Sequence, residues 1–340
     1  MVGGISLVLC CHNSAQRLPQ TLAHLSSQQM IDHVPWEVIV VDNASTDGTT
    51  QAALRCWPSN SPFAVRIVQE PRLGLSYARY RGFREAQYAI VSFVDDDNWI
   101  SGDWVQVTVE VMSRHPEVGA CGGASEAVYE SDPPWWFEQY KDCYAVGPQA
   151  NEEGDITMTR GFLWGAGLSV RKVAWQRLVN NGFRSLLVGR QGSSPSSGED
   201  SELCYALRLA GWRLWYDPRL RLRHFVSAPR LEWNYLRRLY RGFGAASVGL
   251  EPYEFAMRQT PNTFRAHVKI TWQFQVYVTL RGLLQRRRKS LLSLRQLLEG
   301  DVEVLVTESG IGRLFELLRR RKAYDRSIRE VREAAWRRVS

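Results

Sequence analysis

Five short segments in the first part of the chain consist mainly of apolar, strand-forming residues. They lie at 5–11, 37–42, 64–68, 89–95 and 117–123. Their apolar residues run continuously instead of alternating with polar ones, which is typical of strands buried on both faces of a parallel sheet. The pattern therefore predicts five strands of one sheet.

The segments between these runs have helical spacing. Leu18, Leu22 and Leu25 share one helical face. Three further helices are predicted at 49–56, 75–87 and 103–114. The alternation of strand and helix predicts an α/β doubly wound sheet. Ligands of such sheets bind beyond the carboxyl ends of the strands, so the residues at those ends are the candidates for chemistry.

The remainder of the chain is less regular. We expect an irregular region at 125–160, helices at 161–178 and 199–210, and a flexible loop at 189–198. Arg-rich helices are predicted from residue 229 onward. The segment 268–280 alternates apolar and polar residues, which favours a strand, whereas its neighbours favour a helix, and both assignments stay open.

Composition limits the classes of protein to consider. Of the 340 residues, 44% are hydrophobic and 23% are charged, as in a globular protein with a sizeable core. The six cysteines form no CxxC pair, so zinc ribbons and thioredoxin-like chemistry are not expected. The first residues lack the features of a secretory signal, and we therefore expect reduced thiols and a cytoplasmic location.

The charge is unevenly distributed along the chain. Residues 1–200 hold 15 Lys and Arg against 22 Asp and Glu, a net charge of −7, whereas residues 201–340 hold 28 against 13, a net charge of +15. An acidic half can host a metal ion, and a basic half can meet anionic lipid or nucleic acid. Ordinary solvated helix faces explain the same distribution.

Three consecutive carboxylates, Asp95, Asp96 and Asp97, end the fourth apolar run. Asp is also common in solvated turns. A divalent cation explains the cluster more economically, because oxygen ligands suit Mg²⁺ or Mn²⁺, which also bind substrate phosphates. In an extended segment Asp95 and Asp97 face one side while Asp96 faces the other.

Other carboxylates occupy comparable places. Asp42 ends the second apolar run, where we favour contact with a base or ribose, and Asp47 follows in the same loop, where we favour helix capping. Glu199 and Asp200 open the predicted helix at 199–210. They are either partners of the helix dipole or, for one of them, a carboxylate base at the edge of the pocket.

Six motifs along residues 4–245 resemble those of glycosyltransferase family 2, a group of inverting enzymes with the GT-A fold that use nucleotide-diphosphate sugars. The motifs are SLVLCCHN (6–13), VVDNASTDGT (40–49), GLSYARYRG (74–82), VDDDN (94–98), WGAGLSVRK (164–172) and GEDSEL (198–203). Tyr80 stands where the family usually has Asn. The pattern is most similar to members of bacterial polysaccharide synthesis. The resemblance implies a Rossmann-like, doubly wound mixed sheet with a helical C-terminal extension.

The resemblance also implies roles for individual residues. Asp97 and Asp95, together with His224, would bind Mn²⁺ or Mg²⁺, although a lone histidine is as often structural. Asp200 would be the general base and Glu199 would orient the reacting groups. The residues that would bind the nucleotide sugar are Cys11, Asn13, Asp42, Arg79, Asp95, Asp96, Gly165 and Ala166. The candidates for binding the acceptor are Trp135, Trp136 and Trp164, for which core packing is the equal alternative.

The reaction implied is transfer of one sugar from a nucleotide-diphosphate sugar, by family frequency a UDP-sugar, to a hydroxyl of a glycan or lipid-linked acceptor. The chain has neither the Q-x-x-R-W motif nor the membrane spans of processive synthases. Two alternatives stay open, a non-catalytic GT-A-like nucleotide-sugar binding protein and a basic nucleic-acid-binding protein. The acidic first 200 residues argue against the latter, so no nucleic-acid partner is expected.

The domain boundaries follow from the same resemblance. Residues 1–225 form the expected catalytic domain, with a nucleotide-binding part at about 1–123 and an acceptor part at about 124–225. Residues 226–340 form a basic helical extension. In it the apolar positions Leu284, Leu291, Leu294 and Leu298 accompany the basic run 286–289. This amphipathic helix would either pack on the catalytic domain or lie on the inner face of an anionic cell membrane.

Overall fold

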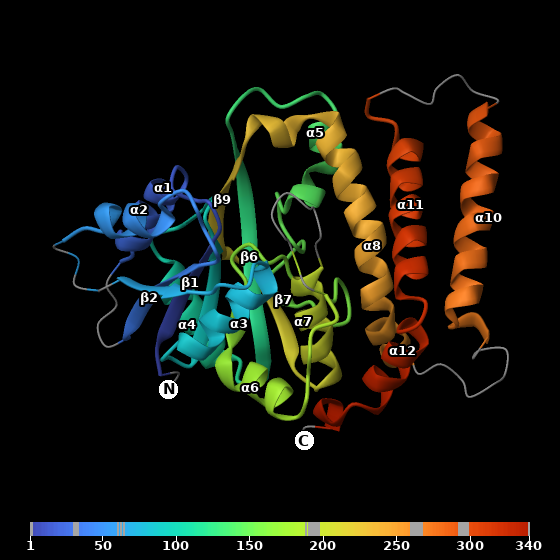
Figure 1. Cartoon of the computed structure of the whole chain (residues 1–340). Coiled ribbons are helices and arrows are strands. Elements are labelled where there is room, and N and C mark those ends of the chain that lie inside the picture. Colours follow the sequence, from blue (N-terminus) through green and yellow to red (C-terminus); the bar gives the residue numbers. More distant parts are fainter. Residues whose placement is uncertain are drawn as a thin grey trace.

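The computed structural model describes residues 3–29, 34–59, 61, 63, 65–187, 189, 198–258, 268–291 and 299–338. Within them, nine strands form one mixed sheet with helices on its two faces, and further helices stack against one side of this unit (Figure 1). The expected α/β fold with a doubly wound mixed sheet and a C-terminal helical extension is confirmed.

The sheet brings several strand ends to one edge. The strands are β1 (Ile5–Cys11), β2 (Trp36–Asp42), β3 (Val65–Gln69), β4 (Ile90–Asp95), β5 (Asn98–Ile100), β6 (Val118–Tyr129), β7 (Gly154–Asp155), β8 (Ser169–Arg171) and β9 (Arg213–Val226). Their order is β3-β2-β1-β4-β8-β6-β9-β5, and β7 pairs with β9. Strand β1 is parallel to β2 and β4, with Cys11 opposite Asp42 and Cys10 opposite Asp95. The carboxylates that end β2 and β4 therefore flank the end of β1.

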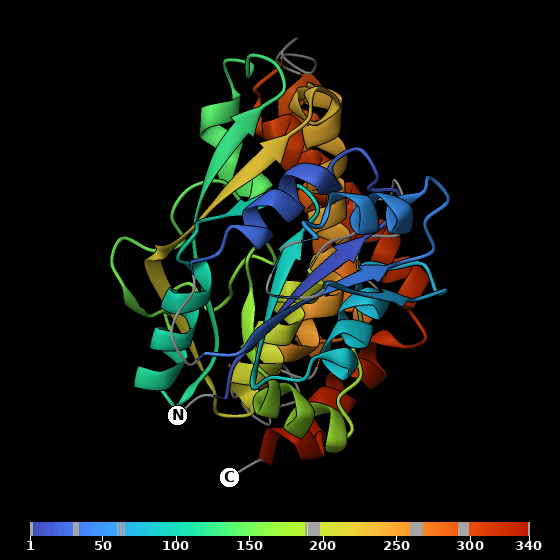
Figure 2. The same ribbon diagram turned by 90° about the vertical axis from the view of Figure 1, so that its left-hand side faces the viewer.

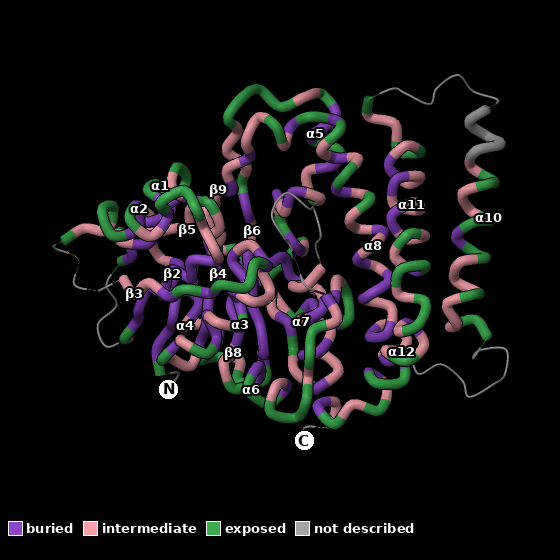
Figure 3. The backbone as a smooth tube through the Cα atoms, viewed as in Figure 1, coloured by how far each residue is buried: buried purple, intermediate pink, exposed green. Residues whose placement is uncertain are grey.

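Alternating side chains of the central strands build two cores, one on each face of the sheet. In β1, Ile5, Leu7 and Leu9 pack on one face and Val8 packs on the other. The first face is covered by α1 (Leu18–Ser26), α2 (Thr49–Cys56) and α4 (Trp104–Arg114). The second face is covered by α3 (Leu75–Glu85), α6 (Lys172–Asn180) and α7 (Glu199–Leu209). Burial on both faces makes the strand interiors the most enclosed part of the chain (Figure 3).

The C-terminal helices form a second layer beside the sheet. They are α8 (Trp233–Met257), α10 (Trp272–Leu291), α11 (Val302–Arg320) and α12 (Tyr324–Glu333). Helix α8 packs on α7 and, through Leu236 and Leu239, on the cluster around Trp136 of the segment before α5 (Phe137–Tyr140). Helix α11 lies along α8, and α10 lies outside α11 (Figure 1). Figure 2 shows this stack behind the sheet.

Two glycines let α8 and α11 approach each other closely. A Cβ added to Gly244 would lie 1.8 Å from the carbonyl oxygen of Ser309, and one added to Gly312 would lie 1.9 Å from that of Arg241. Glu308 of α11 is buried at the same contact and accepts hydrogen bonds from the guanidinium groups of Arg237 and Arg241. Backbone contact and a buried carboxylate thus fix this helix pair.

One predicted helix is wrong over most of its length. Residues 161–178 contain a loop, the short strand β8 and only the first part of α6. Gly161 and Gly167 have φ values of +77° and +73°, in the left-handed region where glycine is favoured and a continuous helix cannot form. The helix begins at Lys172.

The open assignment at 268–280 is resolved as a helix. Trp272, Val276, Thr279 and Leu283 recur at helical spacing along the side of α10 that faces α11 and its neighbours. No strand pairs with this segment among the described residues, so its period-two pattern has no ladder to join. Leu294 and Leu298, as well as residues 190–197 of the predicted loop, lie outside the described residues.

Across the described part of the chain, no helix combines the length and the apolarity that crossing a bilayer requires.

Candidate active site

A cavity of about 710 Å³ opens at the carboxyl ends of β1 and β4. Its lining includes residues 10–12, 95–97, 142–145, 164–166 and 198–201, together with Arg79, Arg160, His224 and Arg230. Its remaining wall is a stripe of α8 formed by Leu239, Phe243, Ala246 and Leu250. The cavity therefore lies where a doubly wound sheet binds ligands, but one wall comes from the C-terminal helices.

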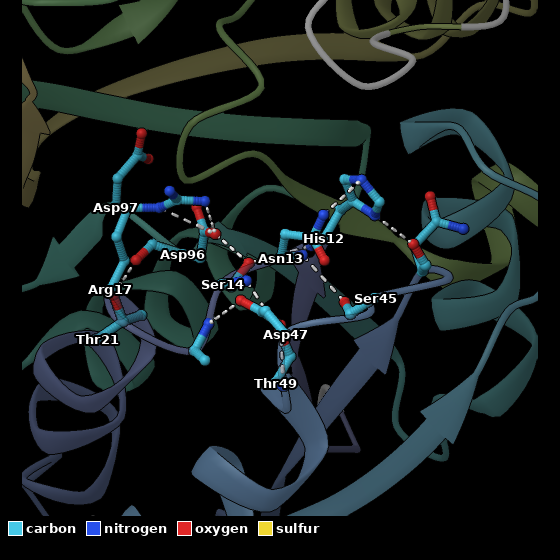
Figure 4. Close-up of polar contacts among 12 residues, drawn as sticks. His12, Asn13, Ser14, Arg17, Thr21, Ser45, Asp47, Thr49, Asp96 and Asp97 are labelled. Atoms are coloured by element: carbon cyan, nitrogen blue, oxygen red, sulfur yellow. Dashed lines mark hydrogen bonds and ion pairs between the residues drawn. The ribbon is translucent and has the colours of Figure 1, made fainter. Parts of the chain in front are cut away.

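Asp96 is held by the start of α1. Its Oδ2 accepts hydrogen bonds from the Ser14 hydroxyl and from the Arg17 guanidinium, whose Nη2 lies 2.6 Å away. The Thr21 hydroxyl donates to the Asp96 carbonyl oxygen at 2.8 Å. Burial and the neighbouring Asp97 raise the pKa of Asp96, although Arg17 opposes this. Asp96 lines the cavity while tying the end of β4 to α1 (Figure 4).

Asp97 points away from this group of contacts (Figure 4). Its Oδ2 lies 2.9 Å from Nη1 of Arg230 and 3.5 Å from Nε2 of His224, and its Oδ1 accepts a hydrogen bond from the Asn98 side chain at 3.0 Å. His224 lies opposite Asn98 in the β5–β9 ladder, which brings the imidazole to the end of β4. The consecutive carboxylates of Asp96 and Asp97 therefore contact different side chains.

The residues around Asp97 fit a divalent ion that is completed by its substrate. The Nε2 atom of His224 faces the Asp97 carboxylate at 3.5 Å, and Asp95 lines the same cavity. Among the described residues, no three His, Cys, Asp or Glu side chains already converge as a metal centre. Mg²⁺ commonly binds through one or two carboxylates plus substrate phosphates, so a sparse protein ligand set suits a nucleotide-bound ion.

The opposite side of the cavity is built around Arg79 and the first turn of α7. Nη1 of Arg79 lies 3.5 Å from Oε1 of Glu199, and its guanidinium passes over Gly165, where a Cβ would lie 2.4 Å from Nη2. Burial alone lowers the pKa of Arg79, but Glu199, Asp95 and Asp200 together raise it above its ordinary value. A permanent positive charge therefore lies between the two groups of carboxylates.

Asp200 is positioned by main-chain groups. Its Oδ2 accepts a hydrogen bond from the Gly165 N–H at 2.7 Å, and its Oδ1 accepts one from the Ser201 N–H at 2.7 Å. Because a carboxylate has about four acceptor positions, both oxygens can accept a further proton or hydrogen bond from a ligand. The loop before β8 thereby orients a carboxylate that lines the cavity.

The loop after β2 is fixed by a polar network. The Asp42 carboxylate accepts hydrogen bonds from Ser45 N at 3.1 Å and from the Thr50 hydroxyl at 2.6 Å. Burial raises the pKa of Asp42, but these hydrogen bonds bring it below its ordinary value. Asn13, at a φ of +50°, accepts from Thr46 N at 2.8 Å, and Asp47 accepts from the Thr49 N–H. The Asn13 N–H also donates to the Ser45 hydroxyl at 3.0 Å, and this contact joins the loops after β1 and β2 (Figure 4).

The other residues that were predicted to bind the nucleotide sugar differ in whether they line the cavity. Cys11 lines the cavity near His12 and is almost fully buried, and burial raises the pKa of its thiol well above the ordinary range. Ala166 lines the cavity beside Gly165. Among the described residues that line the cavity, neither Asp42 nor Asn13 appears.

The three tryptophans predicted to bind the acceptor lie in three different environments. Trp164 lines the cavity, with the Arg160 guanidinium 4.7 Å from its ring. Trp136 is 1% exposed and packs on Trp233 in the hydrophobic cluster under α8. Trp135 is 74% exposed, and its ring lies against Gly300. Neither Trp135 nor Trp136 is among the described residues that line the cavity.

Sequence reasoning missed Arg230, Arg160 and the apolar stripe of α8. Arg230 follows β9 and is 133 residues from Asp97 in the chain, so no local motif connects the two. Arg160 lies four residues before Trp164, a spacing that carries no signal by itself. The stripe of α8 has helical periodicity, which in a sequence is indistinguishable from a core-facing side.

Comparison with known proteins gives a consistent picture. The model of the family described as glycosyl transferase family 2 matches residues 6–175. The uncharacterized glycosyltransferase YfnE of Bacillus subtilis is 27% identical over 137 residues, which are 40% of this chain and 33% of YfnE. The succinoglycan biosynthesis protein ExoM of Rhizobium meliloti is 25% identical over 242 residues, which are 70% of this chain and 72% of ExoM. The chain thus spans only a third of YfnE, and 45% of the putative glycosyltransferase EpsH of Bacillus subtilis.

Solved structures share the fold at low identity. TarS 1-349 of S. aureus in complex with UDP is 17% identical, with a TM-score of 0.50 over 97% of this chain and 90% of that chain. A mannosyltransferase from Pyrobaculum calidifontis in complex with GDP-Man and Mn²⁺ is 16% identical, with a TM-score of 0.54 over 94% and 86%. The similarity extends into the C-terminal helices.

Proposed function

Because the chain belongs to glycosyl transferase family 2, we propose that it transfers one sugar, with inversion, from a UDP-sugar to a hydroxyl of a glycan or lipid-linked acceptor. The observation that carries the proposal is that Asp97, after β4, and Asp200, in the first turn of α7, line the same cavity. The UDP and UDP-GlcNAc complexes of TarS, which shares the fold, support the choice of nucleotide. The name of ExoM supports a polysaccharide product.

We assign Asp97, Asp95 and His224 to a divalent ion, Mn²⁺ or Mg²⁺. The position of His224 Nε2, 3.5 Å from the Asp97 carboxylate, and the Mn²⁺ complex of the Pyrobaculum mannosyltransferase support this assignment. When bound, such an ion would act as a Lewis acid toward the diphosphate leaving group. Arg79 adds a fixed positive charge on the opposite wall.

Asp200 is the general base in this proposal. The acceptor oxygen forms a bond to the anomeric carbon, its proton passes to Asp200, and the bond from that carbon to the diphosphate breaks, so that nucleoside diphosphate leaves. The hydrogen bonds from Gly165 N and Ser201 N hold the carboxylate in one orientation before the acceptor arrives. Such preorganisation is what a positioned base requires.

The function is tested by binding and by transfer. We expect UDP with Mn²⁺ to raise the thermal unfolding temperature, and each alone to do so much less, because the two ligands complete one site. Sugar transfer is then measured with a panel of nucleotide sugars. The absence of stabilisation by UDP with Mn²⁺, or sugar transfer that persists in EDTA, would contradict the metal-dependent function.

Asp200→Asn separates binding from chemistry. The amide oxygen can still accept the Gly165 hydrogen bond, so nucleotide binding should be retained. Loss of the base should reduce kcat by at least about 10²-fold. Ser201→Ala is the matched control, because it alters the same turn while keeping the carboxylate and the main-chain donors. Wild-type kcat in Asp200→Asn would remove this residue from the mechanism.

The C-terminal helices are proposed to face a lipid-linked acceptor. The outer side of α10 exposes Tyr277, Val278, Leu280 and Leu284 around the cation Arg281. Aromatic, aliphatic and basic side chains on one helix surface favour the interface of an anionic membrane. The apolar stripe of α8 in the cavity supports an acceptor that has an apolar portion.

A further inference from the structure

Arg230 lies directly on the carboxylate that we assign to the divalent ion. Its Nη1 is 2.9 Å from Oδ2 of Asp97 and 3.3 Å from Nε2 of His224. The His224 nitrogen is itself 3.5 Å from the same Asp97 oxygen. A guanidinium therefore occupies the position between the two side chains that is best suited to a shared metal ion.

The contact is built into the fold. Arg230 belongs to a short 3₁₀ turn, Ala228–Leu231, whose backbone is anchored by a hydrogen bond from Arg230 N to the Ser227 carbonyl oxygen at 2.9 Å. The Ala228 N–H donates to the Glu130 carboxylate at 2.8 Å, and Leu231 is buried under α8. The guanidinium also lies 5.8 Å from the centre of the Tyr235 ring, and its buried Nε has no hydrogen-bond partner among the described residues. Displacement of the guanidinium would therefore require rotation of the side chain but no change of the anchored backbone.

The neighbouring pair of Arg17 and Asp96 provides a comparison within the same cavity. Arg17 holds Asp96 through both Nε and Nη2, and the Ser14 hydroxyl donates to the same carboxylate. The Arg17 side chain is 43% exposed, whereas that of Arg230 is 14% exposed inside the cavity. The two pairs have the same chemistry and both line the cavity, but of these two arginines only Arg230 contacts a carboxylate that we assign to the metal ion.

A divalent ion and a guanidinium repel each other strongly when they share one partly buried oxygen. The donor supplies an alternative partner for the displaced cation, since the planar fork of arginine suits phosphate oxygens. We propose that Arg230 is the resident counter-ion of Asp97, that the divalent ion displaces it, and that its released guanidinium binds the donor diphosphate. This inference rests on the proposed function and adds a donor-binding residue contributed by the C-terminal part of the chain.

Mn²⁺ titration calorimetry without nucleotide tests the displacement. Arg230→Gln should bind Mn²⁺ about tenfold more tightly than wild type, the order of effect that an adjacent cation has on an ionised carboxylate. Arg17→Gln is the matched control, because it removes the same charge from the adjacent carboxylate without vacating the position between Asp97 and His224, and its Mn²⁺ affinity should therefore rise less than that of Arg230→Gln. Arg230→Lys keeps a cation at the site and should remain close to wild type.

UDP titration at saturating Mn²⁺ tests the second step. Arg230→Gln should lose about tenfold in UDP affinity, because one charged phosphate contact is removed. Mn²⁺ binding by Arg230→Gln no tighter than by Arg17→Gln, or undiminished UDP affinity, overturns the inference. These results differ from failure of the proposed function, in which wild type itself would bind no UDP with Mn²⁺. Retained Mn²⁺ binding by Arg230→Lys would show that a substitution at this position does not by itself unfold the site.

Discussion

At the scale of single residues, adjacent positions take on unrelated tasks. Asp96 turns to Ser14 and Arg17, while Asp97 turns to His224 and Arg230. The alternation of an extended segment predicts this divergence, but Asp96 and Asp97 lie in the turn between β4 and β5, and both line the cavity. The sequence could not identify the partners of Asp97, because they are brought to it by the β5–β9 ladder and the turn that follows it.

A residue-scale prediction concerns His24, which stacks on Trp99 with ring centroids 5.9 Å apart and has Nε2 3.3 Å from the Arg223 guanidinium. Burial and Arg223 lower the pKa of His24 below its ordinary 6.5. Protonation therefore costs more in the folded chain, and the free energy of unfolding falls as pH decreases from about 6.5 toward the lower folded pKa.

We expect His24→Gln to flatten this part of the pH dependence. The measurement is urea denaturation at intervals between about pH 7.5 and 5, the range in which histidines titrate. His115→Gln, which removes another histidine stacked on a tryptophan, provides the comparison. An unchanged slope in His24→Gln would assign the acid sensitivity to other groups.

At the scale of elements, the local pattern predicted the helices and strands of the first half and also α7, whereas tertiary contacts determined the structure at 161–171 and along α10. The predicted helix 49–56 coincides with α2 because apolar residues repeat there on one face of the helix. Along α10 the apolar residues fit both the alternation of a strand and one face of a helix. Packing against α11 stabilises the helix. At 161–171 the left-handed backbone of Gly161 and Gly167 prevents the helix that was expected.

An element-scale prediction concerns the crossing of α8 and α11. Gly312→Ala places a Cβ 1.9 Å from the Arg241 carbonyl oxygen, and this backbone atom cannot move without separating the helices. We expect the free energy of unfolding to fall by about 1–3 kcal/mol. Gly282→Ala on α10 is the matched control, because its Cβ meets no atom within 4 Å. Helix propensity should make that variant about 0.5–1 kcal/mol more stable. Similar changes in urea unfolding for both variants would contradict the close crossing.

At the scale of the whole molecule, the charge asymmetry follows the architecture. The acidic first 200 residues build the carboxylate-rich end of the sheet, and the basic remainder builds most of the helical stack. The domain boundary near residue 225 stays a prediction. What the sequence did not indicate is that α8, beyond that boundary, supplies one wall of the cavity. Long-range packing of this kind leaves no local signature.

A whole-molecule prediction concerns the exposed side of α10. We expect the protein to co-sediment with vesicles that contain anionic lipid, and increasingly less as salt is added, because electrostatic attraction is screened. Tyr277→Glu with Leu284→Glu should weaken this binding by at least about tenfold, since it removes apolar contact and adds negative charge. Leu54→Glu, at an exposed apolar residue of α2, is the matched control. Equal sedimentation with purely zwitterionic vesicles would contradict the proposed surface.

The origin of the cavity wall in α8 also bears on how the protein is made. Translation delivers the strands that end in Asp42 and Asp95 long before it delivers Leu250. A nascent chain can therefore fold its first strands and helices on the ribosome while the cavity still lacks one wall. Under the proposed function, sugar transfer would have to wait until synthesis has passed α8.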